Sequence, residues 1–243
     1  MMKKNSLGLS KIPKNNLTLT CGIDEAGRGP VLGPMVLCGV CYFNTNLNFL
    51  SEIGVKDSKR LSPKKRKEIA EIIKQNCHSH KIIIVDADEI DNREERKISL
   101  NRLEELKMAE IINILKPDQI YIDAADVNEE RFGISIKNLL NYKPKKIVSR
   151  HKGDEIYPIV SAASIIAKEK RDCIIEDLKI EYGDFGSGYP SDRKTIQYLQ
   201  SWAKKNKNFP PFARKTWYTS KKIFNNEVAN KKLTDFLDDS LLD

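Results

Sequence analysis

Two adjacent carboxylates close an apolar segment near the start of the chain, and a glycine-rich loop follows them directly. The segment LTLTCGID, residues 17–24, is rich in β-branched residues and is typical of a strand. Glu25 and then Gly27-Arg28-Gly29-Pro30 come next. Carboxylates at the end of a buried strand are costly unless a cation pairs with them. Mg²⁺ takes oxygen ligands and keeps water or phosphate in the rest of its shell, so the pair predicts a divalent-metal site.

Strand geometry restricts how this pair can act together. Alternation along a strand would place Asp24 and Glu25 on opposite faces of a sheet. The two converge only if the strand ends there and the glycine turn redirects Glu25, so we expect the strand to end at Asp24. A dinucleotide loop is the alternative. It is disfavoured because the glycines have the spacing GxGxxxG, and because Pro30 and two carboxylates suit a pyrophosphate poorly.

Two further acidic residues lie where strands are expected to end. Asp123 is part of the apolar segment IYIDAA, and Asp154 lies in HKGDEIYP, just before a helix expected from Ser161. Open α/β sheets bind their ligands at strand ends. Asp126 and Glu155 are the alternatives at these two positions. Four carboxylates at the ends of three strands favour metal binding over separate helix caps or surface acids.

Cysteines give no comparable signal. Cys38 and Cys41 have the CxxC spacing of zinc and redox sites, but they lie inside the apolar run PMVLCGVCYF without a second pair or a nearby histidine. A buried strand explains them better. We expect reduced, structural thiols at all five cysteines, which are Cys21, Cys38, Cys41, Cys77 and Cys173.

The acidic residues require a sheet to position them, and the chain predicts one. Strands are expected over 17–24, 34–43, 81–87, from about 119, and over 145–149. Helices are expected over 62–76, about 99–115 and 161–180. In the first of these, Ser62 is the N-cap and Pro63 the first helical residue. The expected order is three strands, with a helix between the second and third, followed by helix, strand, strand and helix. A hairpin-like start followed by a βα unit predicts an α/β fold with a mixed sheet.

Composition changes after Gly188. From Ser191 to Phe224 the only acidic residue is Asp192. The basic residues there are Arg193, Lys194, Lys204, Lys205, Lys207, Arg214, Lys215, Lys221 and Lys222. The interleaved aromatic residues include Trp202, Phe209, Phe212, Trp217 and Tyr218. This mixture suits a lobe that binds a nucleic-acid duplex, although the aromatic residues could equally form the core of the lobe and the lysines its solvated face.

The whole chain has 243 residues and a net charge of +8, which favours polyanionic partners but alone supports only non-specific binding. No apolar stretch of secretory or membrane-spanning length occurs. We therefore expect an intracellular, cytoplasmic protein without a membrane partner.

Several motifs resemble those of type 2 ribonucleases H, in the archaeal and eukaryotic branch. The segment GIDEAGRGPVLGPMV carries the first likeness, and VKDSKRLSPKKR resembles the next motif. YIDAADVNEERF, HKGDEIYPIVSAASIIAKEKRD and GSGYPSD resemble the later ones. The likeness covers about residues 18–220 with the motifs in the family's order.

The resemblance implies a ribonuclease H-like fold, with a mixed five-stranded sheet flanked by helices and a small helical C-terminal extension. We expect an N-terminal tail over 1–16, a catalytic domain over 17–190, a substrate-binding lobe over 191–224 and a C-terminal tail over 225–243.

The family's four catalytic, metal-binding carboxylates correspond to Asp24, Glu25, Asp123 and Asp154, all present here. The resemblance implies hydrolysis with two divalent ions, Mg²⁺ or Mn²⁺, and in-line attack of water on the phosphate. The ribose hydroxyl is recognised rather than used as the nucleophile, so the products would carry 5′-phosphate and 3′-hydroxyl ends.

The family's substrate-binding residues also have counterparts. Gly27, Arg28 and Gly29 correspond to a loop whose backbone approaches the ribose 2′-OH, the group that distinguishes RNA from DNA. Tyr189 corresponds to a tyrosine that stacks on the sugar beside the scissile position. Lys59 is the expected phosphate contact, and Lys56 and Lys168 are weaker candidates.

The implied activity is endonucleolytic cleavage of the RNA strand of RNA–DNA hybrids and of ribonucleotides embedded in duplex DNA. Such an enzyme would remove RNA primers and misincorporated ribonucleotides. Archaeal relatives act alone, whereas eukaryotic ones work in a heterotrimer, and we expect a monomer here.

A further motif lies at the C-terminus. NKKLTDFL, residues 230–237, resembles the peptide by which replication proteins dock on a sliding clamp. Leu233, Phe236 and Leu237 would be the apolar anchors, but Asn230 stands where such peptides usually begin with glutamine. The alternative is an ordinary amphipathic turn.

Two other functions remain as alternatives. Junction resolvases and integrase-like nucleases also gather carboxylates at strand ends, but their motifs lack DEAGRGP and GSGYPSD. A non-enzymatic nucleic-acid-binding subunit would not need the four carboxylates.

Overall fold

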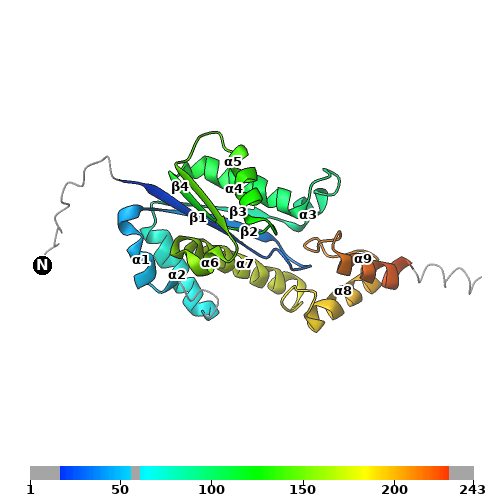
Figure 1. Ribbon diagram of the computed structural model, residues 1–243. Helices are drawn as coiled ribbons and strands as arrows, with labels where there is room; N and C mark the ends of the chain where they lie inside the picture. Colours follow the sequence, from blue (N-terminus) through cyan, green and yellow to red (C-terminus); the bar gives the residue numbers. More distant parts are fainter. Residues whose placement is uncertain (1–16, 56–60, 230–243) are drawn as a thin grey trace, which may run out of the picture.

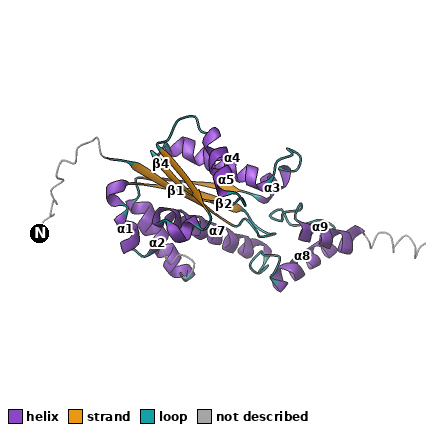
Figure 2. Cartoon of the chain, in the orientation of Figure 1, coloured by secondary structure: helices purple, strands orange, loops and turns teal. Residues whose placement is uncertain are grey.

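A five-stranded sheet lies at the centre of the computed structural model, which describes residues 17–55 and 61–229 (Figures 1 and 2). The strands are β1 (Leu19–Ala26), β2 (Met35–Phe43), β3 (Ser79–Val85), β4 (Gln119–Asp123) and β5 (Lys146–Arg150). The α-helices are α1 (Asn48–Glu52), α2 (Pro63–Asn76), α3 (Ala87–Asn92), α4 (Leu100–Leu115), α5 (Glu129–Asn138), α6 (Gly153–Ile156), α7 (Pro158–Tyr182), α8 (Arg193–Asn206) and α9 (Tyr218–Phe224). A 3-10 turn, η2 (Asn44–Asn46), follows β2, and a π-helical turn, η4 (Asn225–Ala229), follows α9.

The strand order is β3-β2-β1-β4-β5. β1 pairs antiparallel with β2, and β2 with β3, whereas β1–β4 and β4–β5 are parallel. The prediction of a mixed five-stranded sheet is therefore confirmed. The expected direct succession of the last two strands was wrong, because α5 connects β4 to β5, and parallel neighbours need such a crossover.

Helices cover both faces of the sheet and bury two separate cores. Helices α1, α2 and α7 pack on one face, against Val36, Cys38 and Val40 of β2. Helices α3, α4 and α5 pack on the other, against Leu37 and Cys41 (Figure 1). Cys38 and Cys41 are thus fully buried on opposite faces, so they cannot share a metal ion. All five cysteines are free thiols, as predicted.

The first strand begins and ends two residues later than predicted. β1 continues through Glu25 to Ala26, because Ala26 still pairs with Val36 of β2. The expectation that the strand ends at Asp24 was wrong, and no turn redirects Glu25. Asp24 and Glu25 therefore keep the alternation of a strand and point to opposite faces of the sheet.

The C-terminal helices form a lobe at the end of α7 (Figure 1). Phe209 and Phe212 are buried in its core with Phe185, so part of the aromatic stretch is structural, as the second interpretation predicted. The basic residues of the lobe are exposed, with the exception of Arg214, which is fully buried. Arg214 is among the basic residues of this stretch, and its burial was not predicted.

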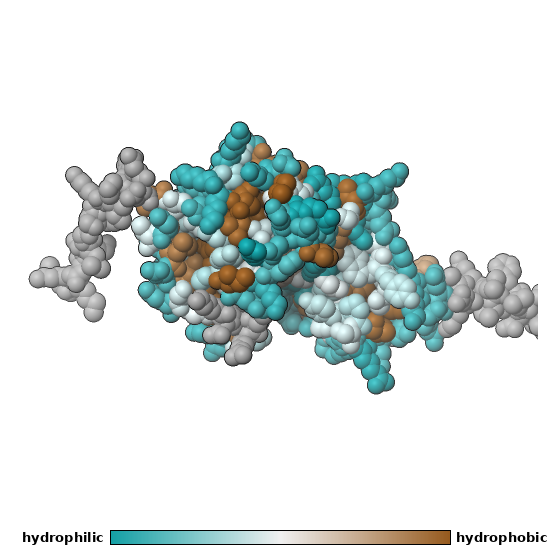
Figure 3. Space-filling view, viewed as in Figure 1, coloured by the Kyte–Doolittle hydropathy of each residue, from teal (hydrophilic) through white to brown (hydrophobic). Residues whose placement is uncertain are grey.

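The surface is consistent with a charged chain. The face seen in Figure 3 is mainly hydrophilic or of intermediate hydropathy, and its apolar residues form separate small patches. Over residues 17–55 and 61–229, none of the helices combines the length and the apolar character needed to cross a membrane.

Candidate active site

Parallel pairing of β1 with β4 places Asp123 beside Asp24, while the neighbouring Glu25 points to the other face of the sheet. The register aligns Ile23 with Ile122, so Asp123 follows beside Asp24 at the end of the paired region. Asp24 is buried and accepts a hydrogen bond from Ser164 of α7. Glu25 is half-buried on the opposite side of the strand, toward α4. The charge of Asp123 raises the pKa of both Asp24 and Glu25, so it lies near enough to each of them to interact electrostatically.

Burial perturbs the titration of this cluster. Burial raises the pKa of Asp24 well above its ordinary value, and the charges of Glu25 and Asp123 raise it further. Burial likewise raises the pKa of Glu25 to about 8, with contributions from Glu104 and Asp123. Arg28 acts in the opposite direction on Glu25. Both carboxyl groups therefore hold their protons more tightly than a solvent-exposed carboxyl group does.

The fourth predicted carboxylate is placed by the short helix α6. The Gly153 amide donates to Oδ1 of Asp123 over 2.7 Å, which ties the start of α6 to the end of β4. A side chain at Gly153 would lie 3.1 Å from the Ile122 carbonyl oxygen, so the two segments are in close contact. Asp154 comes next and is buried, whereas Glu155 is exposed beside Lys152. Burial next to Asp123 favours Asp154 over Glu155 as the site residue.

Asp126, the other alternative, is already engaged. Its carboxylate accepts two hydrogen bonds from Nη2 of Arg131, at 2.6 and 2.7 Å. Asn101 of α4 and the amide of Asn128 donate to it as well. These hydrogen bonds lower its pKa to about 2. Asp126 supports the loop after β4 rather than presenting free oxygen atoms to a ligand.

The carboxylate cluster fits a divalent cation. Its donors are all oxygen atoms, the set that Mg²⁺ and Mn²⁺ prefer. Oε2 of Glu25 is buried and has no hydrogen-bond partner among the described residues. Over 17–55 and 61–229, however, no three histidine, cysteine or acidic side chains already stand where they could jointly hold one ion. The choice of ligands therefore stays a prediction.

The glycine loop lies directly beside the carboxylates. Gly27 has φ +83°, and a side chain there would lie 2.3 Å from Nε of Arg171, so only glycine fits. Gly29, by contrast, is exposed. A Cβ atom at Gly29 would have the ring of Tyr189 as its nearest neighbour, 3.7 Å away at Cε1. The loop thus presents bare backbone next to an aromatic ring.

Backbone hydrogen bonds hold Tyr189 beside this loop. The carbonyl of Gly188 accepts from the amides of Val31 and Leu32, at 2.8 and 3.1 Å. The guanidinium of Arg171 lies over the Tyr189 ring, 5.8 Å from its centroid. Tyr189 remains 41% exposed, enough for its ring to meet a ligand. The structure brings together the loop and the tyrosine that the motifs predicted separately.

The side chain of Arg28 turns away from solvent toward α4. It donates to the carboxylate of Glu104 and, over 2.7 Å, to Oδ1 of Asn101. Glu104 is fully buried, and burial raises its pKa to about 7 despite the opposing charge of Arg28. Sequence reasoning missed Glu104. The available signal was its position on the apolar face of α4, four residues after Leu100 and four before Met108.

The predicted lysines have different outcomes. Lys168 is half-buried and donates to Oγ of Ser164 over 2.9 Å, the same hydroxyl that donates to Asp24. Lys168 therefore contacts the carboxylate of Asp24 only indirectly, through Ser164. Lys56 and Lys59 lie outside the described residues.

Comparison with known proteins identifies the family to which this chain is similar. The ribonuclease HII family model matches residues 21–220. The ribonuclease HII of Pyrococcus furiosus is 50% identical over 212 residues, which cover 86% of this chain and 93% of the relative. The solved ribonuclease H2 of Pyrococcus horikoshii has a TM-score of 0.81 and 44% identity, covering 86% of this chain and 98% of that one. Ribonuclease HII from the Archaeoglobus fulgidus complex with PCNA has a TM-score of 0.77 and 40% identity, covering 84% and 96%. These structures confirm the predicted fold class.

The raised pKa of Glu25 predicts how stability responds to pH. Without divalent ions, the melting temperature should fall as pH rises from about 5 to about 8. The folded state then keeps a proton on Glu25 that the unfolded state releases, so this group alone lowers stability by at most ~1.4 kcal/mol per pH unit. The raised pKa values of Asp24 and Glu104 act in the same direction. Glu25→Gln should make this slope shallower, whereas Glu110→Gln, an exposed glutamate of α4, should leave it unchanged. Differential scanning calorimetry with and without Mg²⁺ measures both. An unchanged slope in Glu25→Gln would contradict this account.

Proposed function

Because this chain belongs to the ribonuclease HII family, it is a hydrolase that acts on the RNA of RNA–DNA hybrids, and we propose that four carboxylates hold its divalent metal ions. They are Asp24, Glu25, Asp123 and Asp154. The family is an endonuclease family that depends on divalent metals. The observation that carries the proposal is the gathering of strand carboxylates beside an exposed glycine and an exposed tyrosine.

The bound ions, two of Mg²⁺ or Mn²⁺, would activate water and stabilise charge on the phosphate. The protein's own groups keep their ligands in place. Ser164 donates to Asp24 and is itself held by Lys168, and the Gly153 amide donates to Asp123. These hydrogen bonds restrict the rotation of both carboxylates, which reduces the reorganisation needed when a substrate binds.

The glycine loop is proposed to distinguish the RNA strand of the substrate from the DNA strand. With no side chain on Gly29, the backbone can approach a ribose closely enough to contact its 2′-OH. Tyr189 stands beside that point and would stack on the neighbouring sugar. Water rather than the 2′-OH is the nucleophile, so the cut leaves 5′-phosphate and 3′-hydroxyl ends. Recognition of a single ribose suits cleavage at ribonucleotides embedded in DNA as well as in hybrids.

The rest of the duplex would meet the basic face of the lobe. Exposed lysines there, such as Lys204, Lys205 and Lys207, can neutralise phosphates without reading sequence. Lys59 is the proposed phosphate contact nearer the site. From these substrates, the proposed role of the protein is the removal of RNA primers and of misincorporated ribonucleotides from DNA.

A sliding clamp is the proposed partner. The Archaeoglobus fulgidus relative forms a complex with PCNA. In this chain the candidate docking peptide is 230–237, with Leu233, Phe236 and Leu237 as anchors. The peptide lies outside the described residues.

Asp24→Asn and Asp123→Asn should each lower cleavage by about a thousandfold or more, because each removes a charged ligand oxygen. Thermal stability should not fall, since the substitution relieves repulsion within the cluster. The assay is a DNA duplex with one embedded ribonucleotide, in Mg²⁺, with product ends mapped. Asp88→Asn, at an exposed aspartate of α3, is the matched control. Near-normal turnover by either variant would overturn the ligand assignment.

Tyr189→Ala should slow cleavage at a single ribonucleotide by roughly 5- to 150-fold, the equivalent of ~1–3 kcal/mol of stacking. Binding of the same duplex should weaken much less, because the lysines of the lobe still contact phosphates. Tyr189→Phe keeps the ring and should retain most activity. Single-turnover kinetics and a binding titration separate the two effects, and equal losses in the Ala and Phe variants would argue against stacking.

Phe236→Ala should abolish retention on the organism's own sliding clamp, because it removes an aromatic anchor from the peptide. Cleavage of a short duplex should be unchanged. Leu241→Ala, which lies beyond the proposed peptide, is the control. A pull-down in which Phe236→Ala binds as well as the unmodified protein would reject this peptide.

A further inference from the structure

A buried arginine of the C-terminal lobe reaches the glycine loop. Arg214 is 0% exposed, and its guanidinium donates to three carbonyl oxygens of that loop. Nη2 donates to Gly27 over 2.5 Å, Nη1 to Arg28 over 2.8 Å and Nε to Gly33 over 3.1 Å. Its backbone amide donates to Val31 over 2.9 Å. One side chain therefore spans both ends of the loop that follows β1.

The cation is held by dipoles rather than by a direct carboxylate hydrogen bond. Burial lowers the pKa of Arg214 to about 9, and the charge of Arg171 acts in the same direction. Arg214 is thus still charged at neutral pH. Hydrogen bonds from a charged donor in a water-poor environment are among the stronger ones. The loop carbonyls are consequently fixed, although its two positive-φ glycines, Gly27 and Gly33, would otherwise leave the backbone free to turn.

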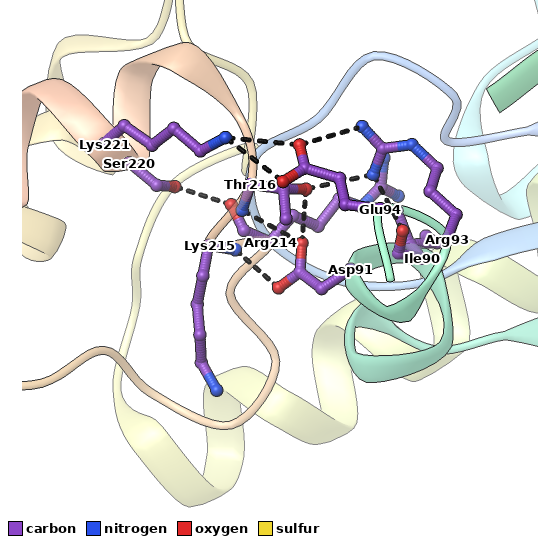
Figure 4. A network of polar contacts seen from close by, with 9 residues as sticks. All are labelled: Ile90, Asp91, Arg93, Glu94, Arg214, Lys215, Thr216, Ser220 and Lys221. Atoms are coloured by element: carbon purple, nitrogen blue, oxygen red, sulfur yellow. Dashed lines mark hydrogen bonds and ion pairs between the residues drawn. The ribbon is translucent and has the colours of Figure 1, made fainter. Parts of the chain in front are cut away.

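A second set of contacts fixes the segment that carries Arg214 (Figure 4). Asp91, at the end of α3, accepts from the amides of Lys215 and Thr216 at 2.7 and 3.0 Å, and from the Thr216 hydroxyl at 2.6 Å. Arg93 donates to the same hydroxyl over 2.9 Å. We call this set of contacts the Asp91 latch. It attaches the lobe to the catalytic part of the chain immediately after Arg214.

Trp217 connects the latch to the guanidinium. Arg93 and Arg214 each lie 4.9 Å from the Trp217 ring centroid. The Ser220 hydroxyl donates to the Arg214 carbonyl over 2.7 Å. Arg214 is therefore held through its backbone, its neighbours and its side chain, and its orientation follows from the latch.

The carbonyl groups that Arg214 binds also determine the direction of the amide groups that follow them in the glycine loop. In a trans peptide the C=O and the next N–H point in opposite directions within one plane. The carbonyls of Gly27 and Arg28 point at Arg214, so the amides of Arg28 and Gly29 point away from it. The Gly29 peptide is the bare, exposed backbone that lies beside Tyr189.

We propose that Arg214 is a positioning residue for the reaction: through the carbonyls of Gly27 and Arg28 it orients the Gly29 amide toward the ribose. The Asp91 latch in turn sets the position of Arg214. This inference rests on the proposed function, in which the loop meets the 2′-OH. The lobe then does more than bind phosphates. It determines the geometry of the group that reads the sugar.

Arg214→Lys keeps the charge but cannot span three carbonyls. Its kcat at a single embedded ribonucleotide should fall by about 10- to 100-fold, the loss expected from a small misplacement, with KM changed less than threefold. Asp91→Ala leaves the loop and Arg214 intact and should produce the same split between kcat and KM. Leu199→Ala, in the buried core of the same lobe, is the control for stability. It should lower the melting temperature without lowering kcat at a temperature where all variants are folded.

Chemical rescue supplies a readout that a purely structural role would not move. Millimolar guanidinium should restore part of the kcat of Arg214→Ala, and none in Leu199→Ala. Arg214→Lys or Asp91→Ala with the kcat of the unmodified protein would overturn the inference, as would an equal kcat loss in Leu199→Ala. If the unmodified protein itself failed to cut at the ribonucleotide in Mg²⁺ or Mn²⁺, the proposed function would fail first, and this inference with it.

Discussion

Burial of carboxylate oxygens on two adjacent strands is the constraint on which the rest of the site depends. The parallel pairing of β1 with β4 places Asp123 where its charge acts on both Asp24 and Glu25. Burial raises the pKa of both members of the pair, and like charges raise it further. Ser164 and Arg28 relieve part of this, but Oε2 of Glu25 has no hydrogen-bond partner within the described part of the chain. A divalent cation, which prefers oxygen ligands, is the partner that would best stabilise these buried carboxylates in their charged form.

The surrounding hydrogen bonds divide the acidic residues into two groups. Asp126 accepts from Arg131, Asn101 and Asn128, so its oxygens are occupied. Asn101 in turn accepts from Arg28, which links the loop after β4 to the glycine loop. One group of acids therefore faces the site, and the other supports the segments that carry it. Supporting groups of this kind restrict the orientation of the site residues.

The glycine loop depends on three separate parts of the chain. Arg28 attaches it to α4, Gly188 pairs with its backbone, and Arg214 fixes its carbonyls from the lobe. Glycine makes the close approach of backbone to a sugar possible, but it also makes the backbone soft. The contacts from outside the loop compensate for that softness. The conformation of the glycine loop consequently depends on the placement of the lobe.

Local pattern was sufficient to predict much of this protein. Alternating and β-branched runs predicted the five strands, and Ser62 with Pro63 predicted the start of α2, where Ser62 indeed caps the helix. The apolar setting of Asp24 and Asp123 identified them as candidates, and the motifs indicated the family. These features depend on residues close together in sequence, so their signal is present in the linear chain.

Tertiary structure decided the features that depend on distant partners. β1 extends to Ala26 because β2 supplies a partner at Val36, which the strand's own sequence does not reveal. Asp154 is buried and Glu155 is exposed, a difference that the sequence HKGDEIYP does not reveal. Arg214 stands in a basic run that gives no sign of its burial, yet it is buried because the carbonyl oxygens that accept its hydrogen bonds belong to a loop near the other end of the chain. Burial of a polar group is determined by which groups satisfy its hydrogen bonds, and the sequence by itself does not say which segments will meet.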